Sequence, residues 1–160
     1  MDFAFFPKFD IMIGSYKIDV PDESEFAQMG ELWEASVRAT HHFLNEQDIA
    51  FFKSLLLNEY FKLVSLFCIR DQDGLITGFM GIESDKLEML FVHPRVMGKG
   101  IGKELLNHAL QTFKINKVDV NEDNPQAVGF YEKMGFKTVS RSALDGMGKP
   151  FPILHMEIVS

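Results

Sequence analysis

The sequence predicts an α/β or α+β fold, in which helices cover the faces of a mixed sheet. Apolar residues recur at helical spacing in two stretches between residues 23 and 60. Strand-length apolar segments separated by turn residues follow, from residue 63 to residue 93. Helical and strand-like segments then alternate up to residue 159. The predicted order is strand, two helices, three strands, helix, strand, helix and two strands. The 160 residues suffice for one domain spanning residues 1–160.

The first third of the chain predicts one short strand and two helices. The stretch from Ile11 to about Val20 is weakly strand-like. Asp22 and Glu25 then have capping-box spacing, and apolar residues at helical spacing follow, which predicts a helix over residues 23–40. A second helix is expected to start at Asn45, with one apolar face formed by Ile49, Phe52, Leu56 and Tyr60.

The middle of the chain predicts three consecutive strands. Leu63 to Arg70 is a dense apolar run of strand length, and Asp73-Gly74 is a strong hairpin signal. Residues 75–83 form the expected returning strand, Ser84-Asp85 a second turn, and residues 86–93 the third strand.

Helices and strands alternate in the last third. Ile101, Leu105, Ala109 and Phe113 predict a helix after a glycine-rich turn. A short strand is expected over residues 117–120. Asn124 is placed to cap the next helix, Pro125 suits its first position, and Gly135 suits its end. Residues 136–142 and 152–159 are expected to be the closing strands.

Composition excludes several functional classes. A formal net charge of −7 disfavours nucleic-acid binding, which depends on Lys and Arg neutralising phosphates. The single cysteine, Cys68, has no internal disulfide partner, which indicates a reducing cytoplasm and a small buried hydrophobe. No apolar stretch reaches the roughly 18 residues of a membrane helix. Residues 1–10 lack the basic region of a signal peptide. We therefore expect no nucleic-acid or membrane partner.

Residues 90–110 predict a phosphate-binding turn between a strand and a helix. Helix N-terminal amides attract anions, and glycines let a phosphate approach the backbone. A P-loop needs four residues between its glycines, whereas three separate Gly98 from Gly102, and Glu104 follows Lys103. A dinucleotide fingerprint needs two residues between its last glycines, but only Ile101 lies between Gly100 and Gly102. The alternative is a purely structural turn from strand to helix that binds no ligand.

This stretch resembles the acetyl-CoA-binding motif of the GNAT acetyltransferase superfamily, whose pattern is Gln or Arg, two residues, Gly, one residue, then Gly or Ala. Gly100 and Gly102 match its glycines, while Met97 departs from the Gln/Arg position. A second match lies in residues 120–136, where Asn124, Ala127, Tyr131, Gly135 and Phe136 correspond to a later motif of the superfamily.

The resemblance implies a mostly antiparallel central sheet with a splay between two central strands, and acetyl-CoA as cofactor. Amides of residues 97 to 102 would hold the pyrophosphate, and Asn124 would bond the pantetheine arm. The implied cofactor-binding residues are Leu90, Phe91, Val92, Met97, Gly98, Lys99, Gly100, Ile101, Gly102, Lys103, Asn124 and Tyr131.

Acetyl transfer to an amine requires a base, oxyanion stabilisation and a proton for the thiolate. Glu88, six residues before Pro94, is the candidate base because several members carry an acidic residue there, and Glu83 is the reserve. Tyr131 is the candidate acid, although a helical face shared with Ala127 is also consistent with core packing. Backbone amides of residues 90–92 would polarise the thioester carbonyl.

The remaining histidines and motifs carry less information. His41 and His42 fall between the first two helices, the region that usually walls the acceptor pocket in this superfamily. His93, His108 and His155 have no metal-ligand spacing, so no metal is expected. The segments WEASVRATHHFL (33–44) and DGMGKPFPILHM (145–156) resemble a bacterial branch of the superfamily, some members of which are described as acetylating protein lysines.

Two functional classes follow from these observations. The first is an N-acetyltransferase acting on a small amine or a protein lysine, as a monomer or homodimer. The second is an acyl-CoA-binding sensor or partner module with weak or no turnover, for which the Met97 departure is the only hint.

Overall fold

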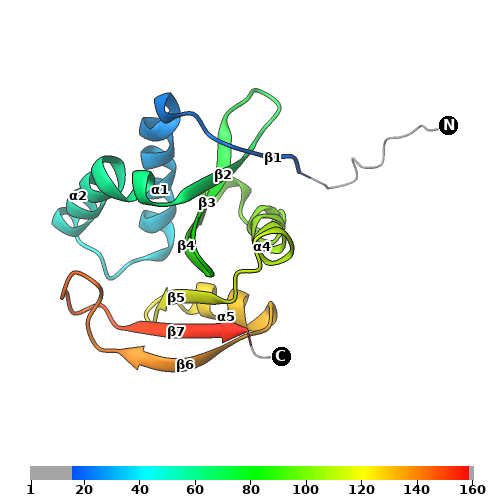
Figure 1. The fold of residues 1–160 in the computed structure, drawn as a ribbon. Coiled ribbons are helices and arrows are strands. Elements are labelled where there is room, and N and C mark those ends of the chain that lie inside the picture. The colour runs from blue at the N-terminus through cyan, green and yellow to red at the C-terminus, as the bar shows by residue number, and fades with distance from the viewer. Residues whose placement is uncertain (1–15, 159–160) are drawn as a thin grey trace.

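A seven-stranded sheet forms the centre of residues 16–158, the part of the chain that the computed structural model describes (Figure 1). Its spatial order is β1-β2-β3-β4-β5-β7-β6. Only β4 and β5 pair in parallel; every other neighbouring pair is antiparallel. The predicted mixed sheet is therefore confirmed. The strands are β1 (Ile18–Asp19), β2 (Ser65–Arg70), β3 (Ile76–Glu83), β4 (Lys86–Val92), β5 (Lys117–Asn121), β6 (Phe136–Ser142) and β7 (Ile153–Ile158).

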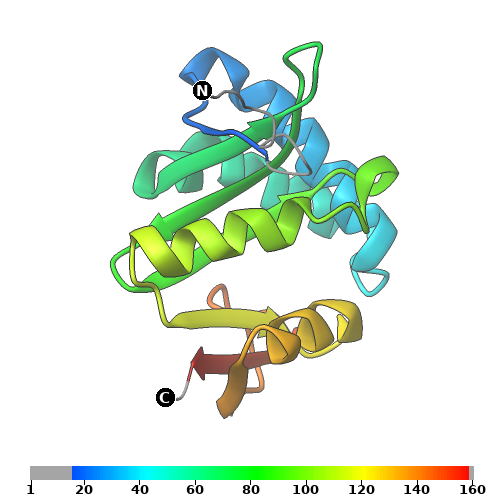
Figure 2. The same cartoon turned by 90° about the vertical axis from the view of Figure 1, so that its right-hand side faces the viewer.

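The helices cover both faces of this sheet. α1 and α2 lie on one face, and α4 and α5 on the other (Figures 1 and 2). The π-helical turn η3 continues α2 into the short α3, and the 3-10 turns η2 and η4 precede α1 and α4. Their bounds are η2 (Glu23–Glu25), α1 (Phe26–Thr40), α2 (Glu46–Leu55), η3 (Leu56–Tyr60), α3 (Phe61–Leu63), η4 (Pro94–Val96), α4 (Ile101–Thr112) and α5 (Pro125–Lys133).

Side-chain caps start three of these elements where the sequence predicts them. Asp22 and Glu25 form the expected capping box at η2. The first turn of the predicted helix, Glu23–Glu25, is 3-10 rather than α-helical. Asn45 forms a second capping box, with Asp48, at the start of α2. Asn124 caps α5, and Pro125 is its first residue.

Two hydrophobic cores lie on opposite faces of the sheet. One packs α1 and α2 against Cys68 and Phe79, and the other packs α4 and α5 against Met80 and Leu87. β3 contributes to both cores, and only its last residue, Glu83, is exposed. β3 is therefore the most buried strand of the sheet, and β4 lies beside it.

Several predicted boundaries differ from the structure, most by a single residue. β2 begins at Ser65 rather than Leu63, because the second helix continues through Leu63 before the chain turns. β4 ends at Val92, because His93 leaves the strand and its Nδ1 accepts the Arg95 N–H over 3.2 Å. Of the weakly strand-like residues 11–20, only Ile18–Asp19 form a strand; residues 11–15 lie outside the described part of the chain.

The two parallel strands at the centre of the sheet separate after a short contact. β4 and β5 pair only through Lys86 with Lys117 and Leu87 with Val118. From Glu88 onward the β5-facing edge of β4 has no strand partner within the described residues. This divergence is the splay that the sequence resemblance implied, and it opens the sheet on the side where α5 begins (Figure 1).

A β-bulge marks the point where β4 leaves β5. Gly81 of β3 pairs with Met89, and its neighbour Ile82 pairs with Leu87, so Glu88 is the extra residue. A bulge re-aims side chains and bends its strand, and bulges are frequent beside functional sites.

Candidate active site

The loop between β4 and α4 exposes a run of backbone donors. Gly98 and Gly100 have φ values of +82° and +85°, the left-handed region, and Gly100 is the N-cap residue of α4. Within residues 16–158, the amides of residues 98–103 have no hydrogen-bond acceptor, as expected at a helix start. Successive free amides and the positive end of the helix dipole together form an anion site.

Met97 lies just outside this run of donors. Its amide donates to the carbonyl oxygen of Pro94 over 3.3 Å, so the free amides are those of residues 98–103 rather than 97–102. Its side chain lines the adjoining cavity where a Gln or Arg side chain would add donors. The loop's anion affinity therefore depends on its backbone.

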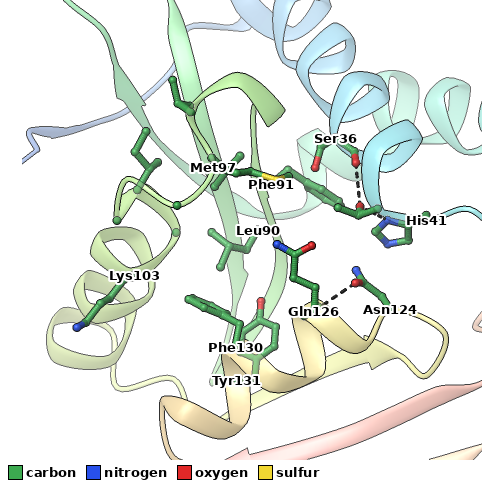
Figure 3. Close-up of a pocket in the computed structure, with 18 residues that line it drawn as sticks. Ser36, His41, Leu90, Phe91, Met97, Lys103, Asn124, Gln126, Phe130 and Tyr131 are labelled. Atoms are coloured by element: carbon green, nitrogen blue, oxygen red, sulfur yellow. Dashed lines mark hydrogen bonds between the residues drawn. The ribbon is translucent and has the colours of Figure 1, made fainter.

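A first cavity, of about 370 Å³, connects this loop with the splayed strands and α5. It brings together every predicted cofactor-binding residue except Lys99 (Figure 3). Lys99 does not line this cavity. Its backbone carbonyl accepts a hydrogen bond from the Tyr16 hydroxyl over 2.8 Å. Ala127, which the second motif included without a binding role, also lines the cavity. The other lining residues, His41 apart, were missed from the sequence: Ser36, Thr40, Val96, Gln126 and Phe130.

Asn124 and Tyr131 present polar atoms to the first cavity from opposite ends of α5 (Figure 3). The Oδ1 of Asn124 accepts the Ala127 N–H over 3.2 Å, which leaves its Nδ2 donors without a partner in the described residues. Tyr131 is 7% exposed, and burial raises the pKa of its hydroxyl well above the ordinary value. That hydroxyl also has no hydrogen-bond partner within residues 16–158 and points into the cavity (Figure 3).

A buried tyrosine hydroxyl without a partner is unusual, because buried polar groups are nearly always hydrogen-bonded. Core packing explains the ring of Tyr131, which stacks edge-on against Phe136 at 5.6 Å. It does not explain the hydroxyl, which is available to a molecule in the cavity.

A second cavity, of about 220 Å³, lies between α1, α2, η3 and the other side of the splay. Phe91 and His41 line both cavities and therefore stand at their junction. Within this second cavity, aromatic side chains come from five segments of the chain: Trp33, Phe43, Phe52, Tyr60, Phe91 and Phe151.

Glu88 lines the second cavity next to Met89, its neighbour in the bulge. Desolvation raises the pKa of its carboxyl, while the Lys86 ammonium partly opposes this rise. Lys86 itself is held by Asp119, with an Nζ–Oδ2 distance of 2.6 Å. Glu88 has no hydrogen-bond or ion-pair partner in the described residues, so its carboxylate is free to take a proton.

Glu83 and the two loop histidines are placed differently. Glu83 does not line the second cavity and meets Glu88 only at a third one, which is lined by the end of η3, α3 and strands β3 and β4. His41 has its Nδ1 2.8 Å from the Thr40 hydroxyl, and burial lowers its pKa to about 4, so the ring is neutral near pH 7. His42 lines neither of the two adjoining cavities.

Other chemistry finds little support in residues 16–158. No group of three or more His, Cys, Asp or Glu side chains there could hold a metal ion. None of the helices in that range combines the length and apolarity needed to cross a membrane. Cys68 is buried, and burial raises the pKa of its thiol to about 11, which makes it unreactive.

Comparison with known proteins agrees with this geometry. The model of the acetyltransferase (GNAT) domain matches residues 38–158. Peptidyl-lysine N-acetyltransferase YjaB of Salmonella typhimurium is 42% identical over 125 residues, which cover 78% of this chain and 86% of that protein. The solution structure of apo YjaB from Escherichia coli has 35% identity and a TM-score of 0.81, covering 90% of this chain and 97% of that one.

A more distant structure shares the fold. The PaiA N-acetyltransferase of Thermoplasma acidophilum, solved in complex with coenzyme A, has 24% identity and a TM-score of 0.68, covering 91% of this chain and 99% of that one. The family match spans most of the chain and most of the residues that line the two cavities. The chain therefore belongs to the GNAT family of acetyl-CoA-dependent N-acetyltransferases.

Proposed function

We propose that this protein, acting as a single domain, transfers the acetyl group of acetyl-CoA to a primary amine by direct attack at the β4–β5 splay. The observation that carries the proposal is the pair of adjoining cavities. One has free amide donors and an unpartnered tyrosine hydroxyl, and the other has an unpartnered carboxylate. Donor and acceptor would meet beside Phe91 and His41, which line both.

The first cavity would hold the donor. The pyrophosphate would accept hydrogen bonds from the amides of residues 98–103, and the Nδ2 of Asn124 would donate to a carbonyl of the pantetheine arm. The backbone amides within residues 90–92 that face the unpaired edge of β4 would polarise the thioester carbonyl. The remaining predicted residues of the loop and β4 would pack around the arm.

The second cavity would hold the acceptor amine. A lysine-like amine has a pKa of about 10.4, so a base must take its proton before the nitrogen attacks. Glu88 would accept this proton, directly or through one water. The nitrogen then bonds to the thioester carbon. As the tetrahedral intermediate collapses, the carbon–sulfur bond breaks and the nitrogen loses its second proton to solvent. Tyr131 would donate its phenolic proton to the departing thiolate and regain one from solvent.

Protein lysine is the acceptor class that we propose. The YjaB proteins, at 42% and 36% identity, carry peptidyl-lysine in their names. The narrow second cavity also suits an unbranched aminoalkyl arm better than a bulky amine, because pockets for drug-sized ligands typically exceed about 300 Å³.

The proposal is tested by measuring coenzyme A release from acetyl-CoA with a panel of amines and lysine peptides. Amine-dependent release is the expected result. Because Cys68 is buried, it should not interfere with thiol detection. Tight acetyl-CoA binding without release for any amine would instead support a binding module that has lost turnover.

Replacing Tyr131 by phenylalanine should slow turnover with little change in acetyl-CoA affinity. Phenylalanine keeps the ring packed against Phe136 but removes the proton donor. Since the hydroxyl has no partner in residues 16–158, its loss should also leave the thermal midpoint nearly unchanged. General-acid catalysis is typically worth about 10²- to 10⁴-fold.

Turnover and thermal midpoint should be measured on the same samples of the Tyr131→Phe variant. Single-turnover kinetics are needed as well, because slow product release masks a chemical step. A variant with a lowered midpoint and unaltered single-turnover rate would show that the hydroxyl supports the fold and not the reaction.

A further inference from the structure

Among residues 16–158, the charged side chains that line the second cavity are all acidic. Glu88 and Asp145 line it, and no Lys or Arg of that range does. His41, the one histidine of that range in the lining, is neutral near pH 7 because burial lowers its pKa to about 4. Glu88 is accounted for by the proposed proton transfer. Asp145, on the loop between β6 and β7, is not.

Hydrogen bonds within its own turn fix the position of Asp145. Its Oδ1 accepts the N–H groups of Met147 and Lys149 over 2.9 and 2.8 Å. Its backbone N–H donates to the Lys149 carbonyl over 2.9 Å. Within residues 16–158, its Oδ2 has no hydrogen-bond or ion-pair partner. One carboxylate oxygen is therefore held by the turn and the other is available to a ligand.

The same loop is fastened to the helices that wall the cavity. The Lys149 ammonium lies 3.7 Å from an Asp48 carboxylate oxygen and 4.7 Å from the centre of the Phe51 ring. Phe151 packs against Phe43 at 5.4 Å and against Phe52 at 6.4 Å. The Tyr60 hydroxyl lies 3.4 Å from the sulfur of Met147. These contacts make the loop a fixed wall of the cavity, with Asp145 built into it.

Two unpaired carboxylates in one aromatic cavity favour a ligand with two positive charges. Glu88 is exposed and Asp145 is half-buried, so neither carboxylate needs a partner to be stable, but each attracts a cation that enters the cavity. Aromatic faces attract cations as well as aliphatic stems. The amine that gives its proton to Glu88 becomes a neutral amide in the product. The acetylated amine therefore does not supply a positive charge that pairs with Asp145 at the end of the reaction.

We propose that Asp145 is a specificity-determining residue that pairs with a second cationic group on the acceptor, beyond the amine that is acetylated. The inference rests on the proposed function, because it takes the second cavity as the acceptor site. The ligand chemistry is an unbranched aminoalkyl arm with a second positive charge. That charge comes either from a basic residue beside the target lysine or from a second amine on a small polyamine.

The test compares matched acceptors with one and two charges. One pair consists of peptides with a single lysine, followed by arginine or by glutamine. The other pair is putrescine (1,4-diaminobutane) and n-butylamine. Wild-type kcat/KM should favour the doubly charged member of at least one pair by about 10- to 100-fold, the size of a hydrogen bond to a charged group. Preference in the peptide pair alone assigns the second charge to a neighbouring residue, and preference in the amine pair alone to a polyamine.

The variant Asp145→Asn should remove this preference. Asparagine keeps an Oδ1 that accepts the same two N–H groups, so the turn is retained, but it does not pair with a cation. The doubly charged acceptor should lose about 10- to 100-fold in kcat/KM, while the singly charged one changes little. The matched control is Asp73→Asn, an equal charge change in the exposed β2–β3 turn, where the Asp73 side chain has no partner in the described residues.

Each outcome decides the question. Wild-type enzyme that acetylates all four acceptors without regard to charge overturns the role of Asp145 and leaves the proposed function standing. So does an Asp145→Asn variant that loses rate equally with both members of a pair. If the wild-type enzyme acetylates no amine at all, the proposed function fails and this inference fails with it. Because wild-type preference is itself a readout, the test does not depend on the variant folding.

Discussion

Replacing Glu88 by glutamine should lower kcat by about 10²- to 10⁴-fold, the usual range for loss of a general base. The amide keeps the size and shape of the side chain in the β4 bulge but does not accept the amine's proton. Glu88 does not line the first cavity, so affinity for acetyl-CoA should stay nearly constant. Steady-state kinetics with a lysine peptide, together with calorimetry of acetyl-CoA binding, measure the two quantities on one preparation.

The pH dependence of the wild-type rate should also show that Glu88 acts as the base. Only ionised Glu88 accepts a proton, and desolvation raises the pKa of its carboxyl while Lys86 partly opposes the rise. The rate should therefore fall as the pH drops through this raised pKa, at a higher pH than a glutamate of ordinary pKa would give. The Glu88→Gln variant should lose that acidic limb.

The matched control is Glu83→Gln, which removes the other carboxylate of the third cavity. It should change turnover little. Full turnover of Glu88→Gln at neutral pH, or a larger loss of turnover in Glu83→Gln, would contradict Glu88 as the base. The role would then belong to Glu83 or to a water chain.

Replacing Gly100 by leucine should weaken acetyl-CoA binding on the order of 100-fold. A hydrogen bond to a charged group contributes about 1.5–3 kcal/mol, so losing one or two of the loop's amide contacts accounts for this change. Gly100 begins the helix whose free amides would hold the pyrophosphate, and its φ is +85°. A leucine here places a branched side chain beside those amides and strains the left-handed backbone.

Gly74 provides a control with the same backbone strain. Its φ is +84°, and, as at Gly100, an added Cβ would meet no atom within 4 Å. It lies in the β2–β3 turn, away from both cavities. Either leucine should cost roughly 1–2 kcal/mol of stability through the left-handed backbone. Only Gly100→Leu should lose acetyl-CoA affinity by calorimetry; equal affinities in the two folded variants would place the pyrophosphate elsewhere.

Local sequence signals predicted most of the fold and the glycine loop, and the family resemblance supplied most of the other residues of the first cavity. The caps at Asp22, Asn45 and Asn124 depend on hydrogen bonds within three residues, so their spacing in the sequence reports the structure directly. The loop around Gly98 and Gly100 is equally local, because positive φ values and a following helix are enough to free its amides.

The second cavity depended on long-range packing that spacing does not reveal. The segment from Asp145 to Met156 was noticed as a family resemblance, but nothing local indicated that Asp145 and Phe151 would meet α2. The bulge at Glu88 arises from a shift in the pairing of β3 with β4, which is likewise invisible in one strand's pattern. Residues such as Ser36 and Gln126 were missed because polar helix residues ordinarily face solvent.

Hydrogen exchange measured by mass spectrometry, with and without acetyl-CoA, tests the central claim most directly. Without ligand, the amides of residues 98–103 have no acceptor in the described chain and should exchange rapidly. Acetyl-CoA should protect peptides covering residues 97–104 and 122–131, and leave the β2–β3 turn at residues 71–74 unchanged. Protection of other segments, with residues 97–104 exchanging as fast as before, would contradict the proposed placement of the cofactor.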